Sequence, residues 1–153
     1  MRFIMLAALL AASPAVSETF SGTSYGHGSS TSETMPVVEG TVVIKTESAY
    51  EMFDVSDDHP LKGASGPCFG AVAIVAGGVS GGGNCLYDTA SGQAVMQWTA
   101  TGINPDGALT GDWTVLGGSG GWAKASGSGT FSSLTNPETG KFVNTIEGSI
   151  TMD

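Results

Sequence analysis

The sequence predicts an all-β protein, an antiparallel up-and-down β-barrel of about eight strands with no significant helix in the mature chain. Several short segments alternate strictly between apolar and polar residues, as strands with one buried face do. Glycine supplies 24 of the 153 residues, and the helix-favouring residues Leu, Lys and Glu are few. Turn signals separate the segments at short intervals, and closing the sheet into a barrel removes its exposed edges.

The first residues have the features of a secretory signal peptide. Arg2 precedes an apolar run over residues 3–12, and Ala15-Val16-Ser17 has the small-x-small pattern of a cleavage site. The apolar run is shorter than the ~20 residues that span a bilayer. We therefore predict three regions: a signal peptide at 1–17, a flexible Ser/Thr/Gly-rich arm or irregular first strand at 18–36, and a β-barrel domain at 37–153. The expected location is secreted or periplasmic, with no membrane span after signal removal.

The charge balance disfavours polyanionic partners. The formal net charge is −9, and removal of Arg2 leaves four lysines against fourteen acidic residues. Nucleic acids and anionic lipids are bound by basic patches. We therefore expect no nucleic-acid partner, and the acidic surface is typical of a soluble exported protein.

Cys68 and Cys85 are the only cysteines of the sequence. In an oxidising compartment such a pair normally forms a disulfide. Two cysteines without a histidine at ligand spacing do not make a zinc site, so we predict no metal and no cofactor. Between them, the glycine-rich segment 77–84 lacks the Lys-Ser or Lys-Thr of a phosphate-binding loop. It is predicted to be a flexible loop at the barrel rim, held at its base by the disulfide.

Residues 94–101 and 110–116 are predicted to form a hairpin around the turn Asn104-Pro105-Asp106-Gly107. A register that places Trp98 opposite Trp113 also brings Met96 opposite Val115. A shift by one residue would turn Trp113 to the other face. The apolar pattern therefore predicts that the two tryptophans are cross-strand partners.

An earlier hairpin is predicted from residues 37–46 and 49–55, with its turn at Glu47-Ser48. Strict alternation in its second strand would place Tyr50 and Met52 on the same face.

A last hairpin is predicted from residues 123–131 and 142–151. Pairing Phe131 with Phe142 sets Ile146 opposite Gly127, a large residue over a small one.

Asp54, Asp57, Asp58 and His59 form the one cluster that resembles a catalytic set. Paired carboxylates beside a histidine are suited to general acid–base work, and carboxylate oxygens bind calcium. The segment lacks the ligand spacing of an EF-hand loop, and the residues that follow have loop composition throughout. We therefore expect a solvated acidic loop.

A family resemblance lies in residues 117–130. This segment contains Gly117-Gly118-Ser119-Gly120, then Trp122-Ala123, then Gly127-Ser128-Gly129-Thr130. It resembles the glycine-rich strand of the allene oxide cyclase and dirigent-like barrel superfamily, in which a Gly-Gly-Thr-Gly turn precedes an aromatic residue and a Gly-x-Gly-Thr strand. The similarity covers about residues 110–151, and Ser119 replaces the usual threonine. The resemblance implies an eight-stranded antiparallel barrel with an apolar cavity, often oligomeric. The family's polar cavity residues have no match here.

A second resemblance lies in Gly111-Asp112-Trp113. It is similar to the Gly-x-Trp signature of lipocalin and avidin-like barrels, which carry it in the first strand rather than late in the chain. This resemblance implies the same architecture.

Two functions fit a barrel of this size, whose interior is either filled or holds one small ligand. A binder needs apolar walls, whereas an enzyme needs a titratable group inside. The face assignment puts no acid or histidine inside, with Asp54 left open, which favours a protein that binds a small apolar or aromatic molecule without chemistry. The residues predicted to line its cavity are Tyr50, Met96, Trp98, Trp113, Gly127 and Phe131. The alternative is a cyclase, isomerase or stereo-directing enzyme of the allene oxide cyclase/dirigent-like kind, and a homo-oligomer suits either.

Overall fold

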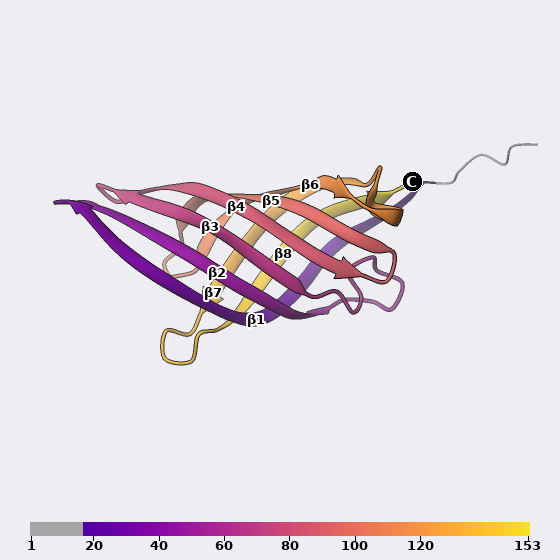
Figure 1. Ribbon diagram of the computed structural model, residues 1–153, viewed down its shortest axis with the longest axis horizontal. Helices are drawn as coiled ribbons and strands as arrows, with labels where there is room; N and C mark the ends of the chain where they lie inside the picture. Colours follow the sequence, from indigo (N-terminus) through magenta and orange to yellow (C-terminus); the bar gives the residue numbers. More distant parts are fainter. Residues whose placement is uncertain (1–16) are drawn as a thin grey trace, which may run out of the picture.

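A computed structural model describes residues 17–153. The predicted signal peptide therefore lies outside the described residues, apart from its last one. Eight antiparallel strands follow one another around a closed barrel, and the last strand pairs with the first (Figure 1). The predicted all-β, up-and-down barrel is thus confirmed. The strands are β1 (Glu18–Val38), β2 (Thr41–Asp54), β3 (Gly66–Val75), β4 (Gly78–Thr89), β5 (Gly92–Ile103), β6 (Leu109–Gly118), β7 (Ser126–Thr135) and β8 (Lys141–Met152).

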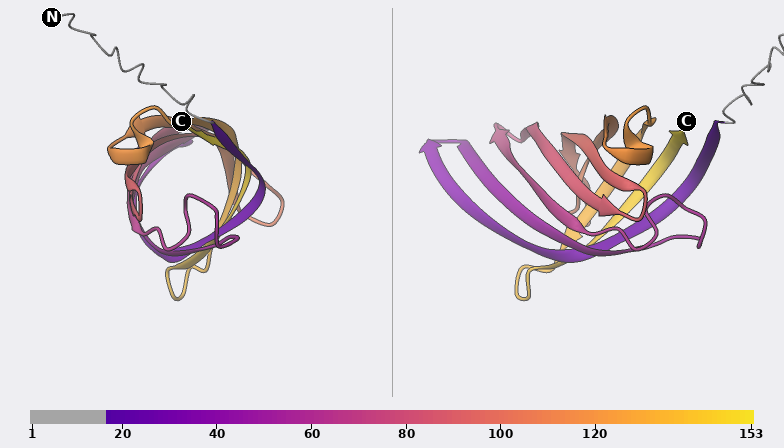
Figure 2. Two further views of the ribbon diagram at one scale, coloured as in Figure 1. Left: turned by 90° about the vertical axis from the view of Figure 1, so that its right-hand side faces the viewer. Right: turned by 45° about the vertical axis from the view of Figure 1, so that its right-hand side comes forward.

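The two ends of the barrel differ. The turns β1–β2, β3–β4, β5–β6 and β7–β8 lie at one end, called the hairpin end here. The start of β1, the end of β8, the loop 55–65 and the short 3₁₀ element η1 (Gly120–Trp122) lie at the other, the terminal end (Figure 2). Within residues 17–153, no helix is long and apolar enough to cross a membrane.

Residues 18–36 form a strand, which is the second of the two alternatives expected from the sequence, and not a flexible arm. They make up most of β1, which pairs with β8 over Glu18–Ser29 and with β2 over Tyr25–Val38. The segment lacks a visible apolar period because its inner face carries small residues, with Gly26 and Gly28 at its centre. Partner strands supply the bulk there, so the barrel begins near residue 18 and not at residue 37.

The first hairpin turns at Glu39-Gly40, and the predicted turn at Glu47-Ser48 is wrong. Gly40 has φ 77°, a left-handed conformation that a glycine adopts without strain. Strand β2 runs without a break through Glu47-Ser48 because both residues pair with β3.

A β-bulge in β2 overturns the predicted face of Met52. Met52 pairs with His27 and Tyr50 with Gly28, so Glu51 is the extra residue. Strict alternation fails across this point, and Phe53 joins Tyr50 on the inner face while Met52 is 52% exposed.

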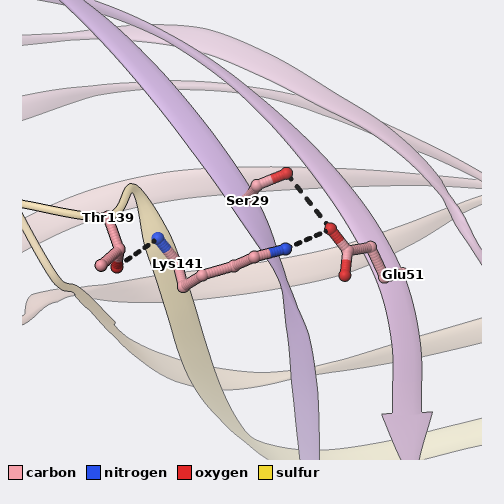
Figure 3. A network of polar contacts seen from close by, with 4 residues as sticks. All are labelled: Ser29, Glu51, Thr139 and Lys141. Atoms are coloured by element: carbon pink, nitrogen blue, oxygen red, sulfur yellow. Dashed lines mark hydrogen bonds and ion pairs between the residues drawn. The ribbon is translucent and has the colours of Figure 1, made fainter.

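The bulge also aims Glu51 outward across β1. Its Oε1 lies 2.7 Å from Nζ of Lys141 on β8 and accepts a hydrogen bond from the Ser29 hydroxyl at 3.3 Å (Figure 3). The backbone N–H of Lys141 donates to Thr139 Oγ1 at 3.3 Å, which orients the start of β8.

The register of β5 and β6 confirms the predicted tryptophan pairing. Trp98 lies opposite Trp113, and Met96 lies opposite Val115. The pairing then shifts by one residue between Ala100 and Gly102. This β-bulge lies next to the β5–β6 turn, past the two tryptophans. It therefore does not change the face on which Trp98 and Trp113 lie.

The register predicted for β7 and β8 is wrong by four residues. Phe131 pairs with Ile146, and Gly127 pairs with Ile150. The reason is that β7 continues to Thr135, farther than predicted. The turn then begins at Asn136, whose side-chain Oδ1 accepts a hydrogen bond from the backbone N–H of Glu138 at 2.9 Å. An even shift keeps every side chain on its predicted face. The strand also begins at Ser126 and not at residue 123, because η1 occupies the preceding turn.

Strands β3 and β4, which carry Cys68 and Cys85, form a hairpin where a flexible loop was predicted for residues 77–84. Residues 78–84 belong to β4, and the turn is Ala76-Gly77, both with positive φ (48° and 83°). Two such residues form the tight turn that matches the twist of a hairpin. The predicted disulfide is confirmed: Cys68 and Cys85 are directly opposite each other, with their Cα atoms 4.0 Å apart.

Candidate ligand cavity

A cavity of about 370 Å³ lies inside the barrel. Every strand and the loop 55–65 contribute to its wall. Its volume falls at the lower end of the range of small-molecule pockets. The cavity is therefore large enough for one small molecule, and the barrel is not completely filled by side chains.

Four aromatic rings pack together on one wall. Tyr50 stacks on Phe53 with ring centroids 5.3 Å apart. Tyr87 lies edge-on to both rings at 5.2 and 5.1 Å, and Phe142 lies edge-on to Tyr50 at 4.8 Å. Offset and edge-on pairs are the favourable arrangements for aromatic side chains. This aromatic cluster (Tyr50, Phe53, Tyr87 and Phe142) is a rigid, mostly apolar surface.

Two glycines of β1 make room for the aromatic cluster. A Cβ at Gly26 would lie 2.6 Å from Cε1 of Tyr50, and one at Gly28 would lie 3.0 Å from Cε1 of Phe142. Because only hydrogen occupies these positions, the rings reach the backbone of β1. The small residues of β1 are thus required by the packing of the rings.

Another part of the wall is formed by the two tryptophans. The indole of Trp98 extends over Gly70 of β3, where a Cβ would overlap its Cζ2 atom, and it meets Phe131 edge-on at 6.3 Å. Trp113 extends the other way, over Gly148 of β8, and its Nε1–H donates to the Glu147 carbonyl oxygen at 3.2 Å. The indoles therefore cover glycines on both sides and form a broad apolar wall.

The loop 55–65 covers part of the barrel mouth at the terminal end (Figure 2, left). Leu61 and Ala64 are buried there, 2% and 0% exposed. His59 is half-buried, faces the cavity and lies edge-on to Phe20 at 5.7 Å, while its Nδ1 accepts from the backbone N–H of Leu61 at 3.2 Å. Burial lowers the pKa of His59, and the nearby Asp58 carboxylate opposes this effect.

Hydroxyl side chains also contribute to the cavity wall. Ser30, Thr46 and Ser48 face it from β1 and β2, and the Ser48 hydroxyl donates to Ser30 Oγ at 3.0 Å. These hydroxyl groups are suited to contact with water or with a polar group of a ligand.

One deep polar pair interrupts the aromatic cluster. Asn144 of β8 is 6% exposed, and its Nδ2 donates to the Tyr50 hydroxyl oxygen at 2.6 Å. Its Oδ1 is buried and has no hydrogen-bond partner within the described residues. Burial raises the pKa of Tyr50 to about 12, against the smaller effects of its hydrogen bonds with Asn144 and Tyr87.

Burial also favours the neutral form of the Tyr87 hydroxyl. Burial, and then the charge and hydrogen bond of Tyr50, raise the pKa of Tyr87 well above its ordinary value. Its hydroxyl also lies 3.3 Å from Sγ of Cys68 in the disulfide. Both tyrosines therefore stay neutral well into alkaline solution.

Five of the six residues predicted to line a cavity do so: Tyr50, Met96, Trp98, Trp113 and Phe131. Gly127 is not among the lining residues. A Cβ there would lie 3.1 Å from Cα of Ile150 and 3.2 Å from Cγ2 of Val115, so neighbouring residues already cover it. That these residues bind a ligand remains a prediction.

The acidic cluster is divided by the fold. His59 turns toward the cavity, while the Asp57 side chain is 97% exposed and pairs with Lys62 at 2.8 Å. Asp54 lies on the outer face of β2 and Asp58 is exposed. Among residues 17–153, no group of three or more His, Cys, Asp or Glu side chains is placed to hold a metal ion.

Sequence reasoning missed Asn144, Phe53 and Tyr87. Asn144 stands two residues from both Phe142 and Ile146, so the alternation itself places it inside. Tyr87 stands two residues from Cys85 in the same way. Phe53 could not be found by alternation because of the bulge at Glu51.

Comparison with protein-family models and with curated proteins finds no match to this chain.

Proposed function

We propose that this protein binds one small, neutral, apolar or aromatic molecule inside its barrel and does no chemistry on it. The observation that carries the proposal is the cavity of about 370 Å³, whose wall contains the aromatic cluster and the two tryptophans. Apolar walls with a few placed polar groups are typical of small-molecule sites.

The composition of the wall indicates a neutral ligand. No Asp, Glu, Lys or Arg is among the residues that line the cavity, all of which belong to the described part of the chain. Moving a charged group into such a site without a partner is strongly unfavourable. A carboxylate or ammonium ligand is therefore disfavoured.

We place the protein outside the cytoplasm, secreted or periplasmic. The signal-like residues 1–17 and the Cys68–Cys85 disulfide support this location. Its acidic surface gives no reason to expect a nucleic-acid partner.

The enzyme alternative has less support. A cyclase, isomerase or stereo-directing enzyme needs a titratable group beside the reacting atoms. Burial raises the pKa of Tyr50 and Tyr87 away from neutrality, and His59 belongs to the covering loop and has no carboxylate partner in the cavity. The likeness to the allene oxide cyclase/dirigent-like superfamily stays a proposal, because eight-stranded barrels occur in unrelated families.

Saturable uptake of the neutral dye N-phenyl-1-naphthylamine tests the proposal. The dye should brighten on binding to the parent protein. Replacing Ile146, which lines the cavity, with Trp should weaken dye binding by about tenfold or more, since added volume competes with the dye. The matched change Val143→Trp lies on the outer face of the same strand, where Val143 is 43% exposed, and should have no effect. A parent protein that takes up no dye would overturn the proposal.

A further inference from the structure

The buried amide of Asn144 is only half satisfied. Its Nδ2 donates to the Tyr50 hydroxyl oxygen at 2.6 Å, but its Oδ1 has no partner within the described residues. Buried polar atoms without a partner are rare in folded proteins, so each one requires an explanation. A ligand that supplies the missing donor is such an explanation.

Asn144 is part of the cavity wall. On β8, Asn144 lies between Phe142 and Ile146 on the inner face, and its cross-strand neighbours are Gly26 and Ser133. The rings of Tyr50 and Phe53 lie over Gly26, and Ser133 lines the cavity beside Asn144. The unpartnered oxygen is itself buried, so a molecule in the cavity reaches it by displacing the neighbouring rings.

Tyr50 completes the polar pair. Its oxygen accepts from Asn144 and also meets the Tyr87 hydroxyl, so its own O–H donates into the site when Tyr87 is the donor of that second contact. One acceptor and one donor therefore lie side by side on an otherwise aromatic wall. A hydroxyl group matches both, because one oxygen atom donates and accepts.

We propose that Asn144 and Tyr50 recognise a hydroxyl group, so that the ligand is a neutral aromatic alcohol or phenol. This inference rests on the proposed function and names the ligand class of the same cavity. A bare hydrocarbon would leave Asn144 Oδ1 unpaired, and a carboxylate would meet no positive charge among the lining residues.

Displacement of N-phenyl-1-naphthylamine compares three ligands of one ring system: 2-naphthol, naphthalene and 2-naphthoate. The parent protein should bind 2-naphthol about tenfold more tightly than naphthalene, and 2-naphthoate more weakly than either. In Asn144→Leu, which keeps the approximate volume, the preference for 2-naphthol should fall to about twofold or less. The control Asn84→Leu changes the same residue type on the outer face of β4 and should keep the parent preference.

A second variant protects the test against misfolding. Asn144→Leu leaves the Tyr50 hydroxyl unpaired, whereas Asn144→Leu with Tyr50→Phe removes both partners, a change that is often close to neutral for folding. The double variant should also lose the preference. In the parent protein, the side-chain amide resonance of Asn144 should shift with 2-naphthol and stay in place with naphthalene.

The two proposals fail in different ways. If the parent takes up dye but binds 2-naphthol and naphthalene equally, the hydroxyl inference is wrong and the binding function stands. A preference that survives in the folded Asn144 variants, or an Asn144 amide resonance that 2-naphthol leaves unmoved, also overturns the inference. If neither the dye nor any of the three ligands binds, the proposed function itself is wrong.

Discussion

At the scale of single residues, glycine determines where the aromatic side chains go. Gly70 and Gly148 lie under the indoles of Trp98 and Trp113, and Gly26 lies under Tyr50 and Phe53. Each glycine lets a ring lie directly on the backbone of the neighbouring strand. In the cavity wall, an aromatic side chain of one strand therefore packs on a glycine of another strand.

Replacing Gly70 with Ala should destabilise the protein by about 1–3 kcal/mol, because the new Cβ overlaps Trp98 Cζ2 and the Gly82 carbonyl oxygen. The control is Gly102→Ala, whose Cβ would lie 3.3 Å from the hydroxyl of Thr110, a side chain that can rotate away. Urea denaturation of both variants measures the difference. Equal midpoints would show that the indole does not lie on Gly70.

At the scale of elements, the loop 55–65 is held by a few contacts, and His59 is its titratable residue that faces the cavity. Because burial lowers its pKa, the unfolded chain binds a proton more readily than the folded protein does. The contribution of His59 is complete above its ordinary pKa of 6.5 and is lost as the pH falls below that value.

The melting temperature of the parent protein should therefore fall between about pH 7.5 and pH 5.5, and that of His59→Gln should change less over the same range. Carboxylates with lowered pKa values, such as Glu51 and Asp58, lose their contribution at lower pH and do not interfere. Identical pH profiles for the two proteins would contradict the role given to His59.

At the scale of the whole molecule, β1 closes the barrel. It pairs with β8 on one side and β2 on the other, although the sequence left open whether most of it is a flexible arm or an irregular strand. The sequence of β1 shows no apolar alternation because it consists mainly of Ser, Thr and Gly. Its inner face needs no large apolar residues, since rings from other strands cover it. Backbone pairing on both edges, more than side-chain hydrophobicity, holds it in place.

Deleting residues 18–29 should therefore abolish cooperative thermal unfolding, since it leaves β8 with an unpaired edge and uncovers the aromatic cluster. A chain that starts at Glu18 is the control and should unfold in a single transition. Near-ultraviolet circular dichroism reports whether the rings keep their fixed packing. A sharp transition in the shortened chain would mean that residues 18–29 are the dispensable arm predicted from the sequence.

The sequence by itself determined the all-β barrel, the disulfide, and the pairing of Trp98 with Trp113, because alternation of large apolar residues specifies which face is buried and hence the register. Only the tertiary structure added the rings of Phe53 and Tyr87 to the predicted cavity wall and showed which polar atom lies among the rings. The bulge at Glu51 replaced Met52 by Phe53 on the inner face, and the longer β7 moved Ile146 opposite Phe131. Bulges and turn positions depend on pairing between strands distant in the chain, so local alternation does not reveal them. The unpaired oxygen of Asn144 depends in turn on where Tyr50, Gly26 and Ser133 meet around the closed barrel.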